Sequence, residues 1–444
     1  MASRGSLFRG FGVAAALVLL AGAAIAAPAP QSKRAVRFGV TPPVSELASR
    51  PGVVLRPTTD KNGVPLPVLK EINPQNTKII KRQVAGNTGA FSDPTLALAR
   101  PEAVAVMPAT LMNFEGVNST TGIHPPDTVG DVGPNHYVQN TNSSTTAITA
   151  IGIYSKTTGA LVVPIFSMST LFSTIGGPCA TGDDGDPITL YDSYADRWFI
   201  SQFALSTTPS HQCIAISQTG DPTGAYYAYD FVMPNNKLND YPHFGVWHDA
   251  YYMTDNQFTS AFEGAGVFAF DRAKMIAGDP TASFIYFDIF GIDPNAGGML
   301  PSDADGFVPP PPGLPQLIME WRADDFGDPL DAMRFYEFIP DFAIPGNSTL
   351  TVRPDLALAA FDARNPSGRA DVEQIAGTNL DSIADRLMHR LQYRNVGTLA
   401  APQNRWTGNF TVNVSGVNPT TAALFQAAPR WFILQSAGTA LPTV

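Results

Sequence analysis

The sequence predicts an all-β fold, a β-propeller of five or more blades that follows a flexible N-terminal leader. Three observations lead to this prediction. The chain has 38 Gly and 39 Pro among 444 residues and only 15% charged residues, which favours many turns and few amphipathic surface helices. A turn motif that opens on Asp recurs along the chain, and sustained helical periodicity is scarce.

The first 26 residues predict secretion. Arg4 and Arg9 precede an apolar run from Phe11 to Ile25, and Ala24-Ile25-Ala26 has the small-x-small pattern of a signal-peptide cleavage site. The run is too short and too rich in Ala for a membrane span, and no other stretch of 18 apolar residues occurs. We therefore expect a secreted protein, extracellular or periplasmic, without a membrane span.

Residues 27–112 have a different composition from the rest of the chain. They are rich in Pro, Ala, Lys and Arg and show no sustained periodicity, so we expect a leader or pro-segment with one short strand around Val53–Leu55. The predicted organisation is a signal peptide over 1–26, the leader over 27–112, and the propeller over 113–444.

From Asn113 onward, each unit opens with an Asp in a Gly/Pro turn and continues with an apolar-aromatic strand, a polar turn and a second strand. The marker residues are Asp127, Asp186, Asp240, Asp305 and Asp385, at intervals of 59, 54, 65 and 80 residues. Repeats of this size match one four-stranded blade with its loops. A β-sandwich or jelly roll is the alternative, but a chain this long would then usually show linker-like breaks, and none occurs after Asn113.

One stretch, residues 382–394, is compatible with a helix or a strand. We favour a strand because its apolar residues and its arginines alternate in parity (Leu387, Leu391 and Tyr393 against Arg386, Arg390 and Arg394).

Several segments resemble a family of secreted bacterial proteins with a sialidase-like or glycosidase-like propeller. The likeness is carried by His124-Pro-Pro-Asp127 and its continuation to Gln139, and by residues 185–192, 239–247, 266–275 and 384–388. It implies further blade sequence after the strand at 429–434, whereas this sequence stops at Val444. Either the ring closes with fewer blades, or the last blade is incomplete.

Cys179 and Cys213 are predicted to form a disulfide, because an isolated pair in an oxidising compartment usually does. The bond would close a loop of about 35 residues and stabilise the fold by roughly 3–4 kcal/mol. The alternative is a thiolate nucleophile at Cys213, activated by His211. The net charge of −10, without a basic run, excludes nucleic acid as an expected partner.

The strand starts of a propeller surround its central funnel, so one marker Asp per blade would form an acidic ring there. Paired carboxylates can hydrolyse a glycosidic bond, and we assign this role to Asp127, Asp186 and Asp240, with Glu320 as an acid. The acidic turn with Asp184 and Asp186 is the best candidate for a Ca²⁺ site, the only cofactor that we expect. The simpler alternative is that each Asp caps a tight turn.

Other polar residues at the blade openings are candidates for ligand binding. Imidazoles, carboxylates and guanidinium groups can all hydrogen-bond a sugar, and Arg can hold a carboxylate with two bonds; these candidates are His124, His243, Asp305, Asp385, Arg197 and Arg386. Buried histidines and surface arginines are the alternatives.

The sequence thus predicts a secreted propeller that binds a polysaccharide or glycoconjugate through an acidic funnel, whose paired carboxylates also suit hydrolysis. The alternative is a non-catalytic propeller that binds an extracellular protein or serves in adhesion.

Overall fold

The structure is a computed structural model that describes residues 28–49, 109–117, 125–142, 149–365, 370–374, 379–415 and 425–442. The predicted signal peptide, the predicted strand at Val53–Leu55 and His124 lie outside these residues. No helix in the described part of the chain has the length and apolar character needed to cross a bilayer.

Three antiparallel sheets follow one another along the first part of the chain. Blade 1 consists of β3 (Val129–Val132), β4 (His136–Asn142), β5 (Thr149–Ser155) and β6 (Phe166–Ser167). Blade 2 contains β7 (Gly185–Asp192), β8 (Arg197–Ala204), β9 (His211–Ser217) and β10 (Tyr226–Val232). Blade 3 contains β11 (Leu238–Val246), β12 (Tyr251–Phe258), β13 (Phe262–Phe270) and β14 (Ser283–Asp288).

Two further blades complete the series. Blade 4 consists of β15 (Leu300–Ala304), β16 (Gln316–Arg322), β17 (Ala332–Ile339) and β18 (Thr349–Val352), with β19 (Leu356–Ala357) beside β17. Blade 5 consists of β22 (Leu387–Asn395), β23 (Gln403–Asn413) and β24 (Ala427–Ala437). The strand predicted within residues 382–394 is therefore present as β22. A small hairpin, β20 (Ala370–Val372) with β21 (Leu380–Asp381), precedes blade 5.

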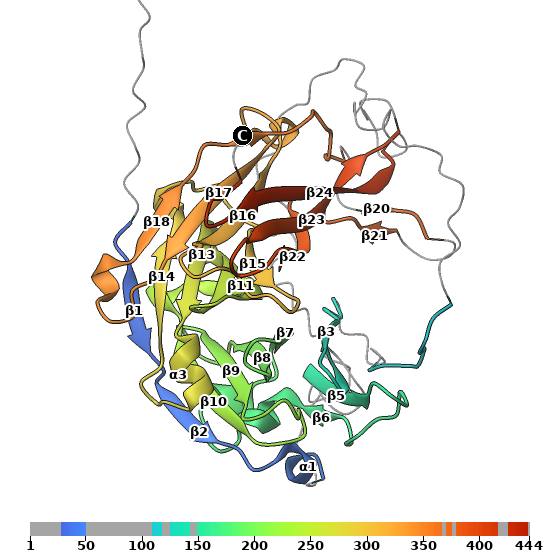
Figure 1. The fold of residues 1–444 in the computed structure, drawn as a ribbon, viewed down its shortest axis with the longest axis vertical. Coiled ribbons are helices and arrows are strands. Elements are labelled where there is room, and N and C mark those ends of the chain that lie inside the picture. The colour runs from blue at the N-terminus through green and yellow to red at the C-terminus, as the bar shows by residue number, and fades with distance from the viewer. Residues whose placement is uncertain are drawn as a thin grey trace, which may run out of the picture.

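The blades are arranged in chain order around a common centre, with β3, β7, β11, β15 and β22 innermost (Figure 1). β15 and β22 pair in parallel, as expected for inner strands that run in the same direction along one axis. These two features confirm the predicted β-propeller, since each blade is an antiparallel meander that starts at the axis.

The core lies between the blades. Phe199 of blade 2 contacts Phe244 and Tyr251 of blade 3, with ring centroids 4.7 and 5.0 Å apart. Tyr252 of blade 3 and Phe338 of blade 4 form a similar contact at 5.4 Å. Neighbouring blades cover both faces of blade 2. Strand β8 is therefore buried on both sides, and its buried and exposed residues do not alternate.

The first described residues belong to the propeller, which differs from the predicted flexible leader. β1 (Gln31–Arg34) extends blade 3 by pairing with β14, and β2 (Arg37–Val40) extends blade 2 by pairing with β10. The short helix α1 (Val44–Leu47) packs on the core between blades 1 and 2. Edge strands are held by backbone hydrogen bonds, so the sequence Gln-Ser-Lys-Arg of β1 carries no apolar signal of its pairing.

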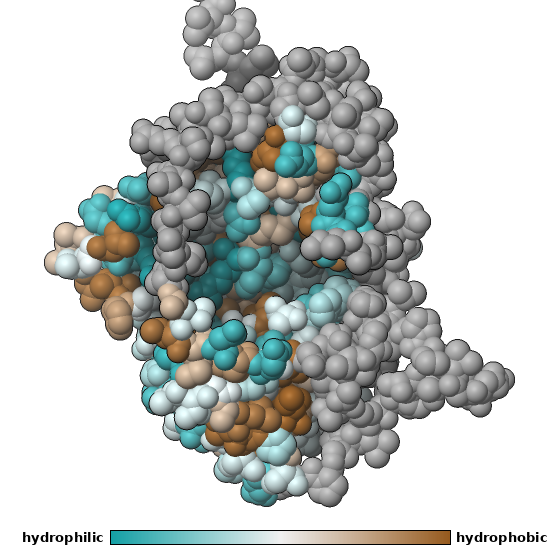
Figure 2. Space-filling view, turned by 90° about the vertical axis from the view of Figure 1, so that its right-hand side faces the viewer, coloured by the Kyte–Doolittle hydropathy of each residue, from teal (hydrophilic) through white to brown (hydrophobic). Residues whose placement is uncertain are grey.

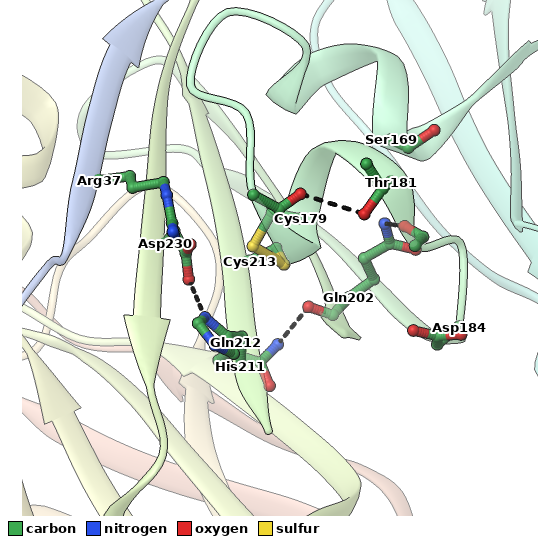
Figure 3. The surroundings of a disulfide bond; sticks show 12 residues. Arg37, Ser169, Cys179, Thr181, Asp184, Gln202, His211, Gln212, Cys213 and Asp230 are labelled. Carbon is green, nitrogen blue, oxygen red and sulfur yellow. Dashed lines mark hydrogen bonds and ion pairs between the residues drawn. A yellow bond between two sulfur atoms is a disulfide. The ribbon is translucent and has the colours of Figure 1, made fainter. Parts of the chain in front are cut away.

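The predicted disulfide is confirmed. Cys179, in the short helix α2 (Pro178–Thr181), is bonded to Cys213 of β9, with Cα atoms 5.6 Å apart. Both residues are buried in the core between blades 1 and 2. His211 lies near them, but its ring is hydrogen-bonded to Asp230, which also forms an ion pair with Arg37 of β2 (Figure 3). The alternative of a free thiolate at Cys213 is therefore wrong.

Candidate functional site

The inner strands begin with the same unusual backbone conformation at one end of the propeller. Asp127 precedes β3 with φ 42°, Asp186 lies at the start of β7 with φ 43°, and Tyr241 follows Asp240 in β11 with φ 55°. Positive φ is uncommon outside Gly, and such residues often occur at functional sites. In blade 4 the corresponding position is Gly298, with φ 58°. We call this end of the axis the mouth.

Tyr241 lies at the centre of the mouth. Its backbone N–H donates to Oδ2 of Asp186 at 3.1 Å, which links blades 2 and 3. The Arg386 guanidinium lies over its ring, 4.8 Å from the centroid. The charge of Asp127 also acts on the Tyr241 phenol, and burial raises the pKa of that phenol. Residues of blades 1, 2, 3 and 5 therefore meet here.

Arg386 is the cation of the mouth. It is buried and forms two hydrogen bonds with Asp385, at 2.8 and 3.2 Å. Burial opposes its charge, but the carboxylates of Asp385 and Asp240 outweigh this effect and raise the pKa of Arg386. Asp127, Asp186 and Asp240 are half-buried, so each is partly accessible to solvent.

Two histidines lie next to Tyr241. The His243 ring meets the Tyr241 ring edge-on at 4.1 Å and stacks on His389 at 4.8 Å with 15° between the planes. Burial, the neighbouring His389 and Arg386 hold the pKa of His243 well below its usual value, and burial lowers the pKa of His389 to about 4. Both imidazoles are therefore neutral at pH 7.

Three of the four ring nitrogens of these histidines have no hydrogen-bond partner within the described residues. His243 is only 7% exposed, yet neither of its ring nitrogens has a partner there, and the same holds for Nδ1 of His389. Buried polar atoms are normally paired, so an unpaired imidazole beside an acidic mouth indicates a place for a ligand or an ordered water molecule.

A second charged cluster lies further along the axis. Arg390 of β22 contacts Asp303 at 3.1 Å and Asp131 at 3.5 Å, and it also binds Asp305. Backbone N–H groups add to the cluster, because Val246 donates to Asp303 and Tyr191 donates to Asp131. All five inner strands, or the residue that directly follows one, thus meet around Arg390.

Asp303 is the most deeply buried member of this axial cluster, with 2% of its surface exposed. Burial raises the pKa of Asp303 to about 6, although Arg390 acts in the opposite direction. Neither Asp131 nor Asp303 was assigned a role from the sequence. The available signal was the position of Asp131 four residues after the marker Asp127, in a strand that starts at the axis.

This raised pKa gives a pH dependence of stability. Since the folded state holds the pKa above that of an unfolded chain, Asp303 stabilises the fold below about pH 4, and the contribution is lost as the pH rises through 6. The loss is roughly 3 kcal/mol. Asp303→Asn keeps an acceptor for Val246, so we expect urea unfolding from pH 4 to 7 to show a shallower decline than in the unchanged protein. An exposed control, Glu373→Gln, should keep the full decline; an identical decline in Asp303→Asn would contradict this assignment.

Three sequence-predicted residues lie away from the mouth. Asp305 follows the end of β15 and belongs to the axial cluster, because blade 4 opens at Gly298 and not at the marker Asp. Glu320 lies in β16, where it accepts a hydrogen bond from Tyr336 at 2.9 Å. Arg197 begins β8 opposite Asp192, at the far end of the strand that Asp186 opens, and donates to the carbonyl of Ala195.

The predicted Ca²⁺ pair does not converge. Asp184 accepts a hydrogen bond from the Leu205 N–H at 2.7 Å, whereas Asp186 accepts from Tyr241 in the next blade. In the described ranges, no three His, Cys, Asp or Glu side chains are grouped in a way that could hold a metal ion. Both Asp residues therefore accept hydrogen bonds from backbone N–H groups. This agrees with the simpler alternative from the sequence, in which each Asp caps a turn.

No known family and no curated protein matches this sequence. Solved structures with some likeness include a subtype N11 neuraminidase-like protein of A/flat-faced bat/Peru/033/2010, at 10% identity and a TM-score of 0.37, covering 71% of this chain and 74% of that one. The α-L-arabinofuranosidase PaAbf62A from Podospora anserina gives 11% identity and a TM-score of 0.29 over 71% and 91% of the two chains. The α-L-arabinanase from Cellvibrio cellulosa gives 12% and 0.23 over 71% and 94%. At these TM-scores, the function has to be argued from the site itself.

Proposed function

We propose that this protein is a secreted carbohydrate-binding propeller that holds an oligosaccharide or polysaccharide at the mouth. The observation that carries the proposal is the gathering of Asp127, Asp186 and Asp240 around Tyr241, with the unpaired imidazole of His243 beside it. The disulfide supports an oxidising compartment, in agreement with the predicted signal peptide.

The chemistry of the mouth suits sugar hydroxyls. Carboxylates accept hydrogen bonds from hydroxyl groups, and a neutral imidazole offers one donor and one acceptor. The half-buried Tyr241 adds an aromatic surface for the apolar side of a sugar ring. Since the acidic groups outnumber the single cation Arg386, the mouth favours neutral or amino sugars over anionic ones.

Hydrolysis is a second candidate function, favoured by the axial cluster. A carboxyl whose pKa is raised toward neutral pH, near a second carboxyl, is the arrangement that glycoside hydrolysis uses. Asp303, with a pKa of about 6, shares Arg390 with Asp131 and supports such a pairing. A non-catalytic propeller that binds an extracellular protein is the remaining alternative.

Asp240→Asn and His243→Ala should each weaken the binding of a neutral oligosaccharide roughly 10- to 100-fold, because each removes a hydrogen-bonding group at the mouth. The measurement is calorimetric titration with ligands selected from a screen of neutral glycans, with release of reducing ends as the readout for hydrolysis. Glu373→Gln, an exposed carboxylate outside the mouth, is the control. The proposal fails if the unchanged protein binds no glycan, or if the control loses as much affinity as the mouth variants.

A further inference from the structure

We propose that a second surface of this protein, the outer face of blade 5, binds an acidic polysaccharide that carries carboxylate or sulfate groups. The outer face is the side of β22, β23 and β24 that is turned away from blade 4. It contains an exposed Trp and two facing arginines, and none of these residues takes part in the mouth. The inference does not depend on the proposed function.

The alternation of β23 and β24 defines this face. Trp406 and Phe410 of β23 are buried in the core that blade 5 shares with blades 3 and 4. The alternate residues of the strand, Arg405, Thr407 and Asn409, point to the opposite side and are exposed or half-buried. The neighbouring strands place their exposed residues on the same side, so one face of the sheet is left uncovered by blade 4.

Trp431 is the aromatic residue of the outer face. It is 69% exposed and lies directly opposite Asn409, while Ile433, 44% exposed, lies opposite Thr407. An exposed Trp on the face of a sheet is costly in water and provides a stacking surface for a sugar ring. The facing amide and hydroxyl can hydrogen-bond the ring substituents.

Arg394 and Arg405 supply the charge. They are direct partners in the antiparallel register between β22 and β23, and both are exposed. No carboxylate in the described ranges lies within ion-pair distance of either side chain. Like charges directly opposite each other destabilise a strand pair, so an anion between them would relieve repulsion and could be held by paired N–H groups.

The two arginines favour an anionic ligand at this surface over the mouth. The chain as a whole carries a net charge of −10, and the mouth is acidic, so an acidic glycan would be repelled there. Figure 2 shows a hollow with hydrophilic walls on this side of the molecule. A Trp for the ring and two Arg for the acid groups favour a glycan over an acidic protein segment.

The test uses the full-length protein with polygalacturonate and dextran sulfate as acidic probes, uncharged dextran as the neutral probe, and polyglutamate as an acidic peptide. We expect Trp431→Ala and the double variant Arg394→Gln/Arg405→Gln each to weaken binding of the acidic polysaccharides roughly tenfold or more. The double variant should also reduce the dependence of affinity on salt. Arg34→Gln/Arg353→Gln removes two exposed arginines from other blades and is the charge-matched control.

Because Trp431, Arg394 and Arg405 are exposed, the variants should melt no lower than the unchanged protein, so that a loss of binding reports on the surface. Asp240→Asn should leave the binding of acidic polysaccharide intact, which separates this inference from the proposed function of the mouth. The inference is overturned if the unchanged protein does not bind either acidic polysaccharide. It is also overturned if polyglutamate binds equally well, if the charge-matched control loses as much affinity, or if Asp240→Asn abolishes binding.

Discussion

Arg390→Met should lower the free energy of unfolding by about 3–5 kcal/mol at pH 8, the cost of removing one partner from a buried ion pair. Arg390 contacts Asp303, Asp131 and Asp305, and it joins blade 5 to blade 1 across the axis. Met keeps much of the side-chain volume, so the loss reports on charge. Chemical denaturation followed by Trp fluorescence measures the effect.

The pH dependence of this variant tests the cause. Asp303, whose pKa is about 6, is largely protonated at pH 5. A neutral carboxyl does not require a positive charge beside it, so Arg390→Met should destabilise the protein less at pH 5 than at pH 8. Arg405→Met, an exposed arginine on the next strand of the same blade, should change the unfolding free energy by less than about 0.5 kcal/mol. An equal effect of both substitutions, or one that is the same at pH 5 and pH 8, would contradict the role of the axial cluster.

Val44→Asp should destabilise the protein by about 4 kcal/mol or more, because it removes a buried apolar side chain and buries a carboxylate without a partner. Val44 of α1 is fully buried on the core between blades 1 and 2. Val36, which lies between β1 and β2 and is 52% exposed, provides the matched control.

Val36→Asp should be nearly neutral in the same thermal and chemical unfolding experiments. This pair of variants decides whether residues 28–49 are part of the folded body or a dispensable leader. If the segment were a leader, the two substitutions would have equally small effects, and limited proteolysis would remove it without loss of stability.

The mouth could be predicted in large part from the sequence. Asp before Gly or Pro marks a tight turn, and a turn of this kind opens each repeat, so the marker residues had to lie at equivalent ends of their strands. Asp127, Asp186, Asp240 and Asp385 do so. Asp305 does not, because it follows the last residue of β15 instead of preceding the first. Asp303-Ala-Asp305-Gly306 has the same Asp-Gly turn pattern as the blade openings, and the local sequence does not tell the start of a strand from its end.

The interactions across the axis could not be predicted. Arg390 and Asp131 lie 259 positions apart in the chain, and their contact depends on how all five blades are placed around the axis. Glu320 was predicted as an acid in the funnel, but its carboxylate lies in β16 and accepts a hydrogen bond from Tyr336 within blade 4. The partner of a polar side chain is set by strand pairing within a blade and by packing between blades, and no short motif encodes either.

The sequence by itself determined the all-β repeat, the strand of blade 5 and the disulfide, because turn chemistry, side-chain alternation and cysteine pairing are local or compartmental signals. The tertiary structure alone decided that the first described residues complete two sheets, that His243 stacks on His389, and that Arg390 is surrounded by carboxylates. These contacts join residues far apart in sequence. Those of His243 and Arg390 exist because a propeller brings one strand of every blade to the same axis, whereas β1 and β2 pair with the last strands of blades 3 and 2.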